Sequence, residues 1–203
     1  MKSLSEIDMV SKRASRAAGF SWGIAEEIGK NIRLLEMFGL PGIKNLNNFL
    51  KKKTSNKYKI LKLISANNKT TNFEFCPINL GTNFLDQIKT LENLNEIKFD
   101  KTAYPLLLLP FVSRASEVIG KRIFLKLDEK EFLLSFNNNI YSNFFRNEML
   151  KFSNKISIKF LENTDSFEQN EWLELYNLSE EIFVEESDSL KKSAAGSILS
   201  DND

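Results

Sequence analysis

The sequence predicts an α+β fold, in which N-terminal helices are followed by a mixed or antiparallel sheet with further helices. From Gly19 to Gly39 apolar residues recur every three or four positions, the spacing of one helix face. From Lys57 onward several segments alternate apolar and polar residues, as half-buried strands do. At 203 residues the chain is long enough for one well-buried core. We expect a single domain over residues 1–185 and a flexible, acidic or partner-docking tail over residues 186–203.

Helix signals are clearest near the N-terminus. Ser21 can cap the helix that starts the Gly19–Gly39 segment, and Gly39 can end it in the left-handed conformation. Pro41 suits the first turn of the next helix. Helices are therefore expected over about residues 3–18, 21–39 and 41–53, with others over about 83–94, 105–120 and 172–178.

Strand signals lie in the middle and later parts of the chain. Arg122–Leu127 and Glu131–Phe136 alternate on either side of a short polar connection, which predicts a hairpin. Other strands are expected over about residues 58–64, 72–76, 96–100 and 155–161.

Charge and composition exclude several function classes. The chain has 28 Lys and Arg against 27 Asp and Glu, a formal net charge of +1. Such a total gives no global field toward nucleic acid or anionic lipid. No apolar run approaches the ~18 residues of a membrane helix. We therefore expect neither a nucleic-acid nor a membrane partner.

The absence of histidine restricts the chemistry further. Without imidazole, Ser-His-Asp and Cys-His sites within this chain are excluded, as are metal sites built on histidine. We expect no metal site and can assign no cofactor. The single cysteine, Cys76, allows no intrachain disulfide, and the N-terminus lacks a signal-peptide pattern, so a cytoplasmic protein is expected.

Two adjacent carboxylates, Glu26 and Glu27, are candidate catalytic groups. Ile24 and Ile28 place Glu27 near the apolar helix face, where partial desolvation would raise its pKa toward the range of a general acid. The alternative is a solvated helix face, on which most charged residues lie.

Cys76 is the third catalytic candidate, at the end of an expected strand and before Pro77. Its thiolate would need a nearby cation or a helix N-terminus, such as that of a helix starting near residues 81–83. The alternative is a buried apolar filler among phenylalanines.

Three arginines are candidate ligand-binding residues. If the first two helices pack antiparallel, Arg13, Arg16 and Arg33 could converge on a phosphate or carboxylate. Trp22 could stack on the same ligand. The alternatives are surface ion pairs for the arginines and a core position for Trp22.

Four segments carry distinctive residues: KRASRAAGFSWGIAEEIGKNIRLLEMFGLPG, FCPINLGTNFLDQI, YPLLLLPFVSRASEVIGKRIFLKL and IFVEESDSLKKSAAGSILSDND. Together they resemble the bacterial domain of unknown function 3726 family, over nearly the whole chain, with the tail as the most specific part. The resemblance implies no catalytic role, because the family has no assigned reaction. It implies motif positions at Gly19, Trp22, Gly23, Glu26, Glu27, Cys76, Pro77, Gly81, Ser187, Gly196, Asp201 and Asp203.

Two interpretations of function remain open. In the first, the chain is an accessory or interaction subunit of a bacterial metabolic system, with a protein partner or a second copy of itself. In the second, it is a small enzyme acting on an anionic small molecule, with Glu27 as the acid or base and the arginines holding the substrate. Whether the chain is an enzyme is not decided by its sequence.

Overall fold

Three helices begin the chain: α1 (Leu4–Ala17), α2 (Trp22–Met37) and α3 (Gly42–Lys53). The computed structural model describes residues 2–53, 58–145, 148–180 and 182. It divides into two compact units, Met1–Asn163 and Thr164–Asp203. The predicted boundary between residues 185 and 186 lies outside the described residues, so it stays a prediction.

The first two helices start where capping residues predict. Ser21 Oγ accepts a hydrogen bond from Ile24 N at 3.4 Å, and Ser3 caps α1 in the same way. α1 crosses α2 closely at Gly29, where an added Cβ would overlap Asp8. Gly39 has φ +72°, the left-handed conformation expected of a C-terminal cap.

The sheet has the strand order β1-β2-β6-β3-β4-β5. β1 pairs parallel with β2, and every other neighbouring pair is antiparallel. β6 lies between β2 and β3, which therefore run parallel to each other and are connected through α5. The strands are β1 (Asn67–Asn68), β2 (Glu96–Ala103), β3 (Arg122–Leu127), β4 (Lys130–Ser135), β5 (Asn139–Ser142) and β6 (Phe152–Leu161).

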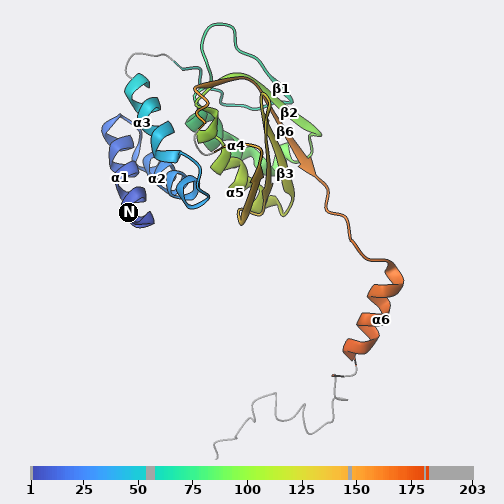
Figure 1. Cartoon of the computed structure of the whole chain (residues 1–203). Coiled ribbons are helices and arrows are strands. Elements are labelled where there is room, and N and C mark those ends of the chain that lie inside the picture. The colour runs from blue at the N-terminus through green and yellow to red at the C-terminus, as the bar shows by residue number, and fades with distance from the viewer. Residues whose placement is uncertain (1, 54–57, 146–147, 181, 183–203) are drawn as a thin grey trace, which may run out of the picture. The chain divides into compact units, whose positions relative to one another are not determined.

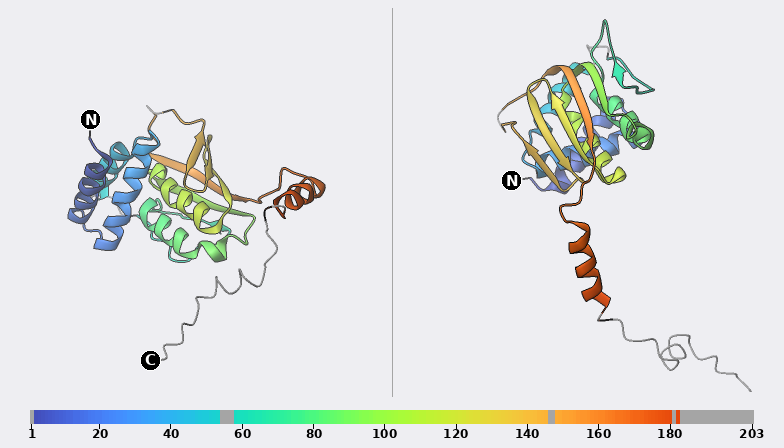
Figure 2. Two further views of the ribbon diagram at one scale, coloured as in Figure 1. Left: turned by 90° about the horizontal axis from the view of Figure 1, so that it is seen from below. Right: turned by 90° about the vertical axis from the view of Figure 1, so that its right-hand side faces the viewer.

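Within the first unit, helices cover one face of this sheet, and none of the described helices of that unit lies on the other, called here the open face (Figures 1 and 2). α4 (Pro77–Leu91) and α5 (Leu109–Ile119) lie on the covered face, and the one-turn helix η1 (Pro105–Leu107) precedes α5. Strand residues alternate accordingly: Ile123, Leu125 and Leu127 of β3 are fully buried. The two helices approach so closely that a Cβ at Gly81 would overlap the Phe111 ring.

The second unit contains the helix α6 (Gln169–Glu180). Trp172 stacks on Phe167 just before the helix, with ring centroids 5.6 Å apart. Glu171 accepts a hydrogen bond from Glu168 N at 2.8 Å, which closes the first turn.

The α+β prediction is confirmed, with helices first and a mixed sheet after. Several details differ. α4 begins at Pro77, earlier than the expected residue 83, because proline suits the first helical turn. The expected strands over 58–64 and 72–76 reduce to isolated bridges of Phe75 with Lys59 and with Thr102. Two strands are unpredicted: β1, and β5 after the β3–β4 hairpin.

Candidate functional site

Glu27 of α2 lies against α5, where its carboxylate forms an ion pair and hydrogen bond with Arg114. Lys30 Nζ lies 3.3 Å from the other carboxylate oxygen. Burial by itself raises the pKa of Glu27, but Arg114 and Lys30 outweigh it, and the pKa lies below its usual value. The expectation of a raised pKa is therefore wrong, and Glu27 is ionised at neutral pH.

Glu26 points to the neighbouring helix and to solvent. Its carboxylate lies 3.8 Å from Lys12 Nζ of α1 and 3.3 Å from Lys30 Nζ. The side chain is half exposed. Glu26 therefore stabilises the α1–α2 surface as an ion-pair partner.

Cys76 is the N-cap residue of α4 and is almost fully buried. Its Sγ lies 3.7 Å from Asn79 Oδ1. Desolvation raises the pKa of the thiol, although hydrogen bonds from the amides of Asn79 and Ile78 and the charge of Lys53 oppose this. Because desolvation is the stronger effect, the sulfur is held as a protonated thiol at neutral pH.

A hollow of about 380 Å³ lies beside Cys76. α2 contributes Ser21 and Ile24 to its wall, α3 contributes Lys53, and α4 contributes Asn79. Lys53 Nζ donates a hydrogen bond to Ala18 O at 2.8 Å. The lining of this hollow is Gly19, Phe20, Ser21, Ile24, Lys53, Tyr58, Ile60, Cys76 and Asn79, so neither Glu26 nor Glu27 contributes to it.

The three candidate arginines do not converge. Arg16 donates to Phe20 O at 2.9 Å and lies 5.2 Å from the centroid of the exposed Trp22 ring. Arg33 lies 4.0 Å from the Asp8 carboxylate, eleven residues beyond Trp22 and so about 16 Å along the helix. Arg13 is exposed on α1. α1 and α2 do pack antiparallel, but this places Arg16 and Arg33 near opposite ends of α2.

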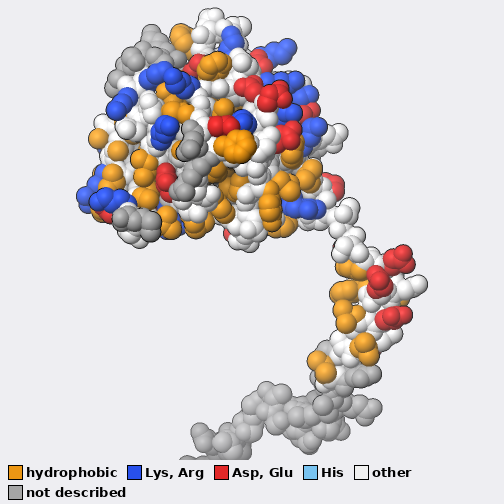
Figure 3. Space-filling model, viewed as in Figure 1, with side chains coloured by type: hydrophobic (Ala, Val, Ile, Leu, Met, Phe, Trp, Pro, Cys, Tyr) orange, Lys and Arg blue, Asp and Glu red, His pale blue; other side chains and the backbone are white. Residues whose placement is uncertain are grey.

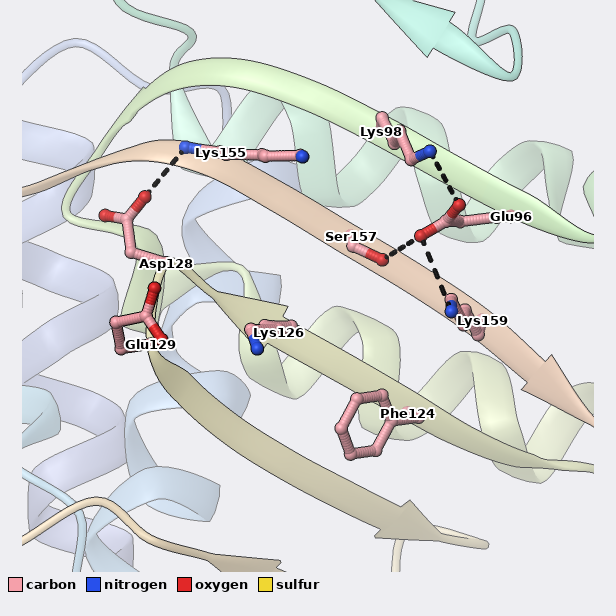
Figure 4. Close-up of a pocket in the computed structure, with 9 residues that line it drawn as sticks. All are labelled: Glu96, Lys98, Phe124, Lys126, Asp128, Glu129, Lys155, Ser157 and Lys159. Atoms are coloured by element: carbon pink, nitrogen blue, oxygen red, sulfur yellow. Dashed lines mark hydrogen bonds and ion pairs between the residues drawn. The ribbon is translucent and has the colours of Figure 1, made fainter.

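A second hollow, of about 450 Å³, lies on the open face of the sheet (Figure 4). At the end of this hollow away from Asp128, Glu96 pairs with Lys98 at 2.7 Å and accepts a hydrogen bond from Ser157 Oγ at 2.6 Å. These two contacts hold the pKa of Glu96 below its usual value. Lys126 pairs with Glu131 at 3.0 Å, which raises the pKa of Lys126.

The turn at one end of this hollow is fixed by Asp128. Its backbone is left-handed, at φ +52°, and its carboxylate accepts hydrogen bonds from Lys155 N at 2.9 Å and Asn154 N at 3.1 Å. The lowered pKa of Glu96 holds its carboxyl in the ionised form at neutral pH. The open-face hollow supports electrostatic binding better than proton transfer at neutral pH.

The sequence did not point to the residues that lower the pKa of Glu27 or line the hollow beside Cys76. Arg114 is 87 positions from Glu27, and Lys53 reaches Cys76's hollow from the far end of α3. No local spacing signals such contacts. Within the described part of the chain, no group of three or more Cys, Asp or Glu residues is arranged to hold a metal ion.

The fold and these sites define a class: an α+β protein that begins with three helices and continues into a mixed sheet, in which the three candidate catalytic residues Glu26, Glu27 and Cys76 make structural contacts. The family described as "Protein of unknown function (DUF3726)" matches residues 2–75. The family resemblance is thereby confirmed, and this segment, which runs from α1 to the residue before Cys76, carries it. No match to a curated protein or to a solved structure was found.

The remaining resembling segments lie beyond the matched residues. The most distinctive of them, with Ser187, Gly196, Asp201 and Asp203, also lies outside the described residues. In the described part of the chain, no helix is both long and apolar enough to cross a bilayer.

Proposed function

We propose that this chain is an accessory or interaction subunit of a metabolic system in the cytoplasm of a bacterium. The chain docks a protein partner through α6. One observation carries the proposal: the apolar side chains of α6 are exposed within the described part of their own unit, where Phe167 stacks on Trp172. Within the second unit, none of the helix residues is buried.

The pattern of α6 is that of a docking helix. Trp172, Leu175 and Tyr176 follow one another at steps of three and one, so they share a side. Glu171 and Glu174 lie toward the opposite side. Figure 3 shows apolar side chains gathered along one side of the helix and acidic ones along the other. Helices of this kind bind by laying such anchors into an apolar groove.

The charge of this segment specifies the partner's chemistry. Residues 164–203 contain two lysines and eleven acidic residues, a formal net charge of −9. A partner groove with an apolar floor would complement the side of α6 that carries Trp172, and a basic rim would complement the acidic residues around it. The predicted tail over residues 186–203 would extend the same contact.

The states of Glu27 and Cys76 support an accessory role over the enzymatic alternative. A general acid needs a pKa raised toward neutrality, and the pKa of Glu27 is lowered. A cysteine nucleophile needs a thiolate, and burial of Cys76 favours the thiol. Glu27 does not line the hollow beside Cys76.

The test compares two double variants of the full chain by chemical cross-linking in cells and quantitative mass spectrometry. Trp172→Ala with Tyr176→Ala removes the apolar anchors, whereas Glu174→Gln with Asn177→Ala is the matched control on other sides of the helix. We expect the anchor variant to lose its cross-linked partner about tenfold or more, as two aromatic anchors are removed. Equal recovery from both variants would contradict docking through α6.

A further inference from the structure

The segment Tyr58–Phe75 projects from the sheet edge at β1, as two views show (Figures 1 and 2). It displays large apolar side chains to solvent. Leu63 is 78% exposed, Ile60 55% and Phe73 48%. A projecting segment that exposes three large apolar side chains is a candidate binding surface.

The backbone on both sides of Leu63 is anchored to α4. Asn83 Nδ2 donates to Leu61 O at 2.6 Å, and Gln87 Nε2 donates to Lys62 O at 2.9 Å. Gln87 Oε1 accepts a hydrogen bond from the N–H of Ile64, whose side chain is buried. Leu63 therefore stands outward between fixed neighbours, and little ordering is needed when it is buried by a partner.

The projecting segment is itself basic. Residues 58–75 contain three lysines and one acidic residue, Glu74. Lys59, Lys62 and Lys69, which lie on the projecting segment itself, are exposed.

The near-neutral total conceals a division of charge. Residues 1–163 have 26 basic and 16 acidic side chains, a formal net charge of +10, against −9 for residues 164–203. The expectation of no membrane partner has two grounds: the missing membrane-spanning run and the whole-chain net charge of +1. This division removes the second ground for the first unit.

We infer that the projecting segment attaches the protein to an anionic lipid surface, with Leu63 entering the boundary between headgroups and acyl chains. The lysines beside it would lie among the negatively charged headgroups. This is attachment at a surface, without a spanning helix, and it goes beyond the proposed function because α6 takes no part in it.

Two features favour lipid over other anionic partners. The two most exposed apolar side chains, Leu63 and Ile60, offer no ring on which a nucleic-acid base could stack, and Phe73 is the less exposed third. The segment is also convex, projecting from the fold, which suits insertion into a bilayer surface better than reception of an acidic peptide. Nucleic acid and acidic protein are therefore outcomes of the test.

The experiment measures co-sedimentation of the full chain with phosphatidylcholine vesicles, with and without phosphatidylglycerol. We expect binding only to the anionic vesicles, weakened at high salt by screening of the lysines. Leu63→Ala should reduce the partition coefficient by about tenfold, since it removes the most exposed inserting side chain. Lys59→Ala and Lys62→Ala should each reduce it by about fivefold.

Controls use exposed residues elsewhere: Val118→Ala on α5 for the leucine, and Lys151→Ala for the lysines. Both should bind vesicles as the unmodified chain does. Three outcomes would overturn the inference: no binding to anionic vesicles at low salt, equal losses in Leu63→Ala and Val118→Ala, or tighter binding to oligo(dT) or polyglutamate than to the vesicles. Unchanged circular dichroism and melting temperature would show that each variant is folded.

Discussion

The carboxylate of Glu27 on α2 is bound by the guanidinium of Arg114 on α5, which ties the N-terminal helices to the helices that cover the sheet. Both side chains are about three-quarters buried. A candidate acid–base residue is therefore a structural link between two parts of the first unit.

Glu27→Gln should lower the stability of the first unit by about 1 kcal/mol, since it leaves the charge of Arg114 only partly compensated. For a domain of this size the melting temperature should fall by about 2–4 °C. Glu26→Gln is the control, because its ion pairs are more exposed. A double-mutant cycle with Arg114→Gln should give a favourable coupling energy, and additive effects would show that the pair contributes nothing.

The pH dependence follows from the lowered pKa of Glu27. Its ordinary pKa is 4.5, and the value in the folded chain is lower. Its contribution to stability is thus fully present above about pH 4.5, and it is lost as the pH falls through the folded-state pKa. Urea unfolding from pH 7 to pH 3 should show a smaller loss of stability in Glu27→Gln than in the unmodified chain. Parallel curves would mean that the carboxylate has an unshifted pKa.

Cys76 should be unreactive in the folded protein. Burial excludes reagent, and the raised pKa keeps the sulfur protonated at neutral pH. Labelling with iodoacetamide at pH 7.5 should be about tenfold or more slower than in the urea-unfolded chain. Labelling of the native protein as fast as that of the unfolded chain would restore Cys76 as a nucleophile candidate.

Two glycine substitutions should have different effects on stability. Gly81→Ala would drive a Cβ into the Phe111 ring between α4 and α5, so it should destabilise by about 1–3 kcal/mol. Gly23→Ala, in the first turn of α2, meets nothing within 4 Å and should be neutral or stabilise the helix by up to about 1 kcal/mol. Denaturant midpoints measured side by side would decide, and a tolerated Gly81→Ala would contradict the close helix contact.

The local parts of the fold could be predicted because their signals are local. α2 is predicted by Ser21, by the apolar spacing and by Gly39, and the β3–β4 hairpin by alternation around a short turn. The sequence predicts too late a start for α4, because Cys76 makes no side-chain capping hydrogen bond and cysteine is an atypical N-cap residue. β5 is four residues long and none of them is buried, so its sequence shows no burial pattern.

The candidate site could be predicted only in part, because its chemistry depends on distant partners. The helix position of Glu27 followed from the spacing, but its pKa is determined by Arg114, far along the chain. The division of charge between residues 1–163 and 164–203 was visible in the sequence, yet the total of +1 hid it. The sequence does not distinguish Leu63 from its apolar neighbours Leu61 and Ile64. In the structure, Asn83 and Gln87 hydrogen-bond the backbone on either side of Leu63, and its side chain is exposed to solvent.

The most direct test of docking through α6 is a photo-cross-linking scan, with a photoreactive residue placed in turn at each position from Gln169 to Glu180 in cells. We predict cross-links to one partner that peak at Trp172, Leu175 and Tyr176 and are weak at Glu171 and Glu174, a helical period of about 3.6 residues. Cross-links of equal strength at all positions, or none at any, would contradict the proposal.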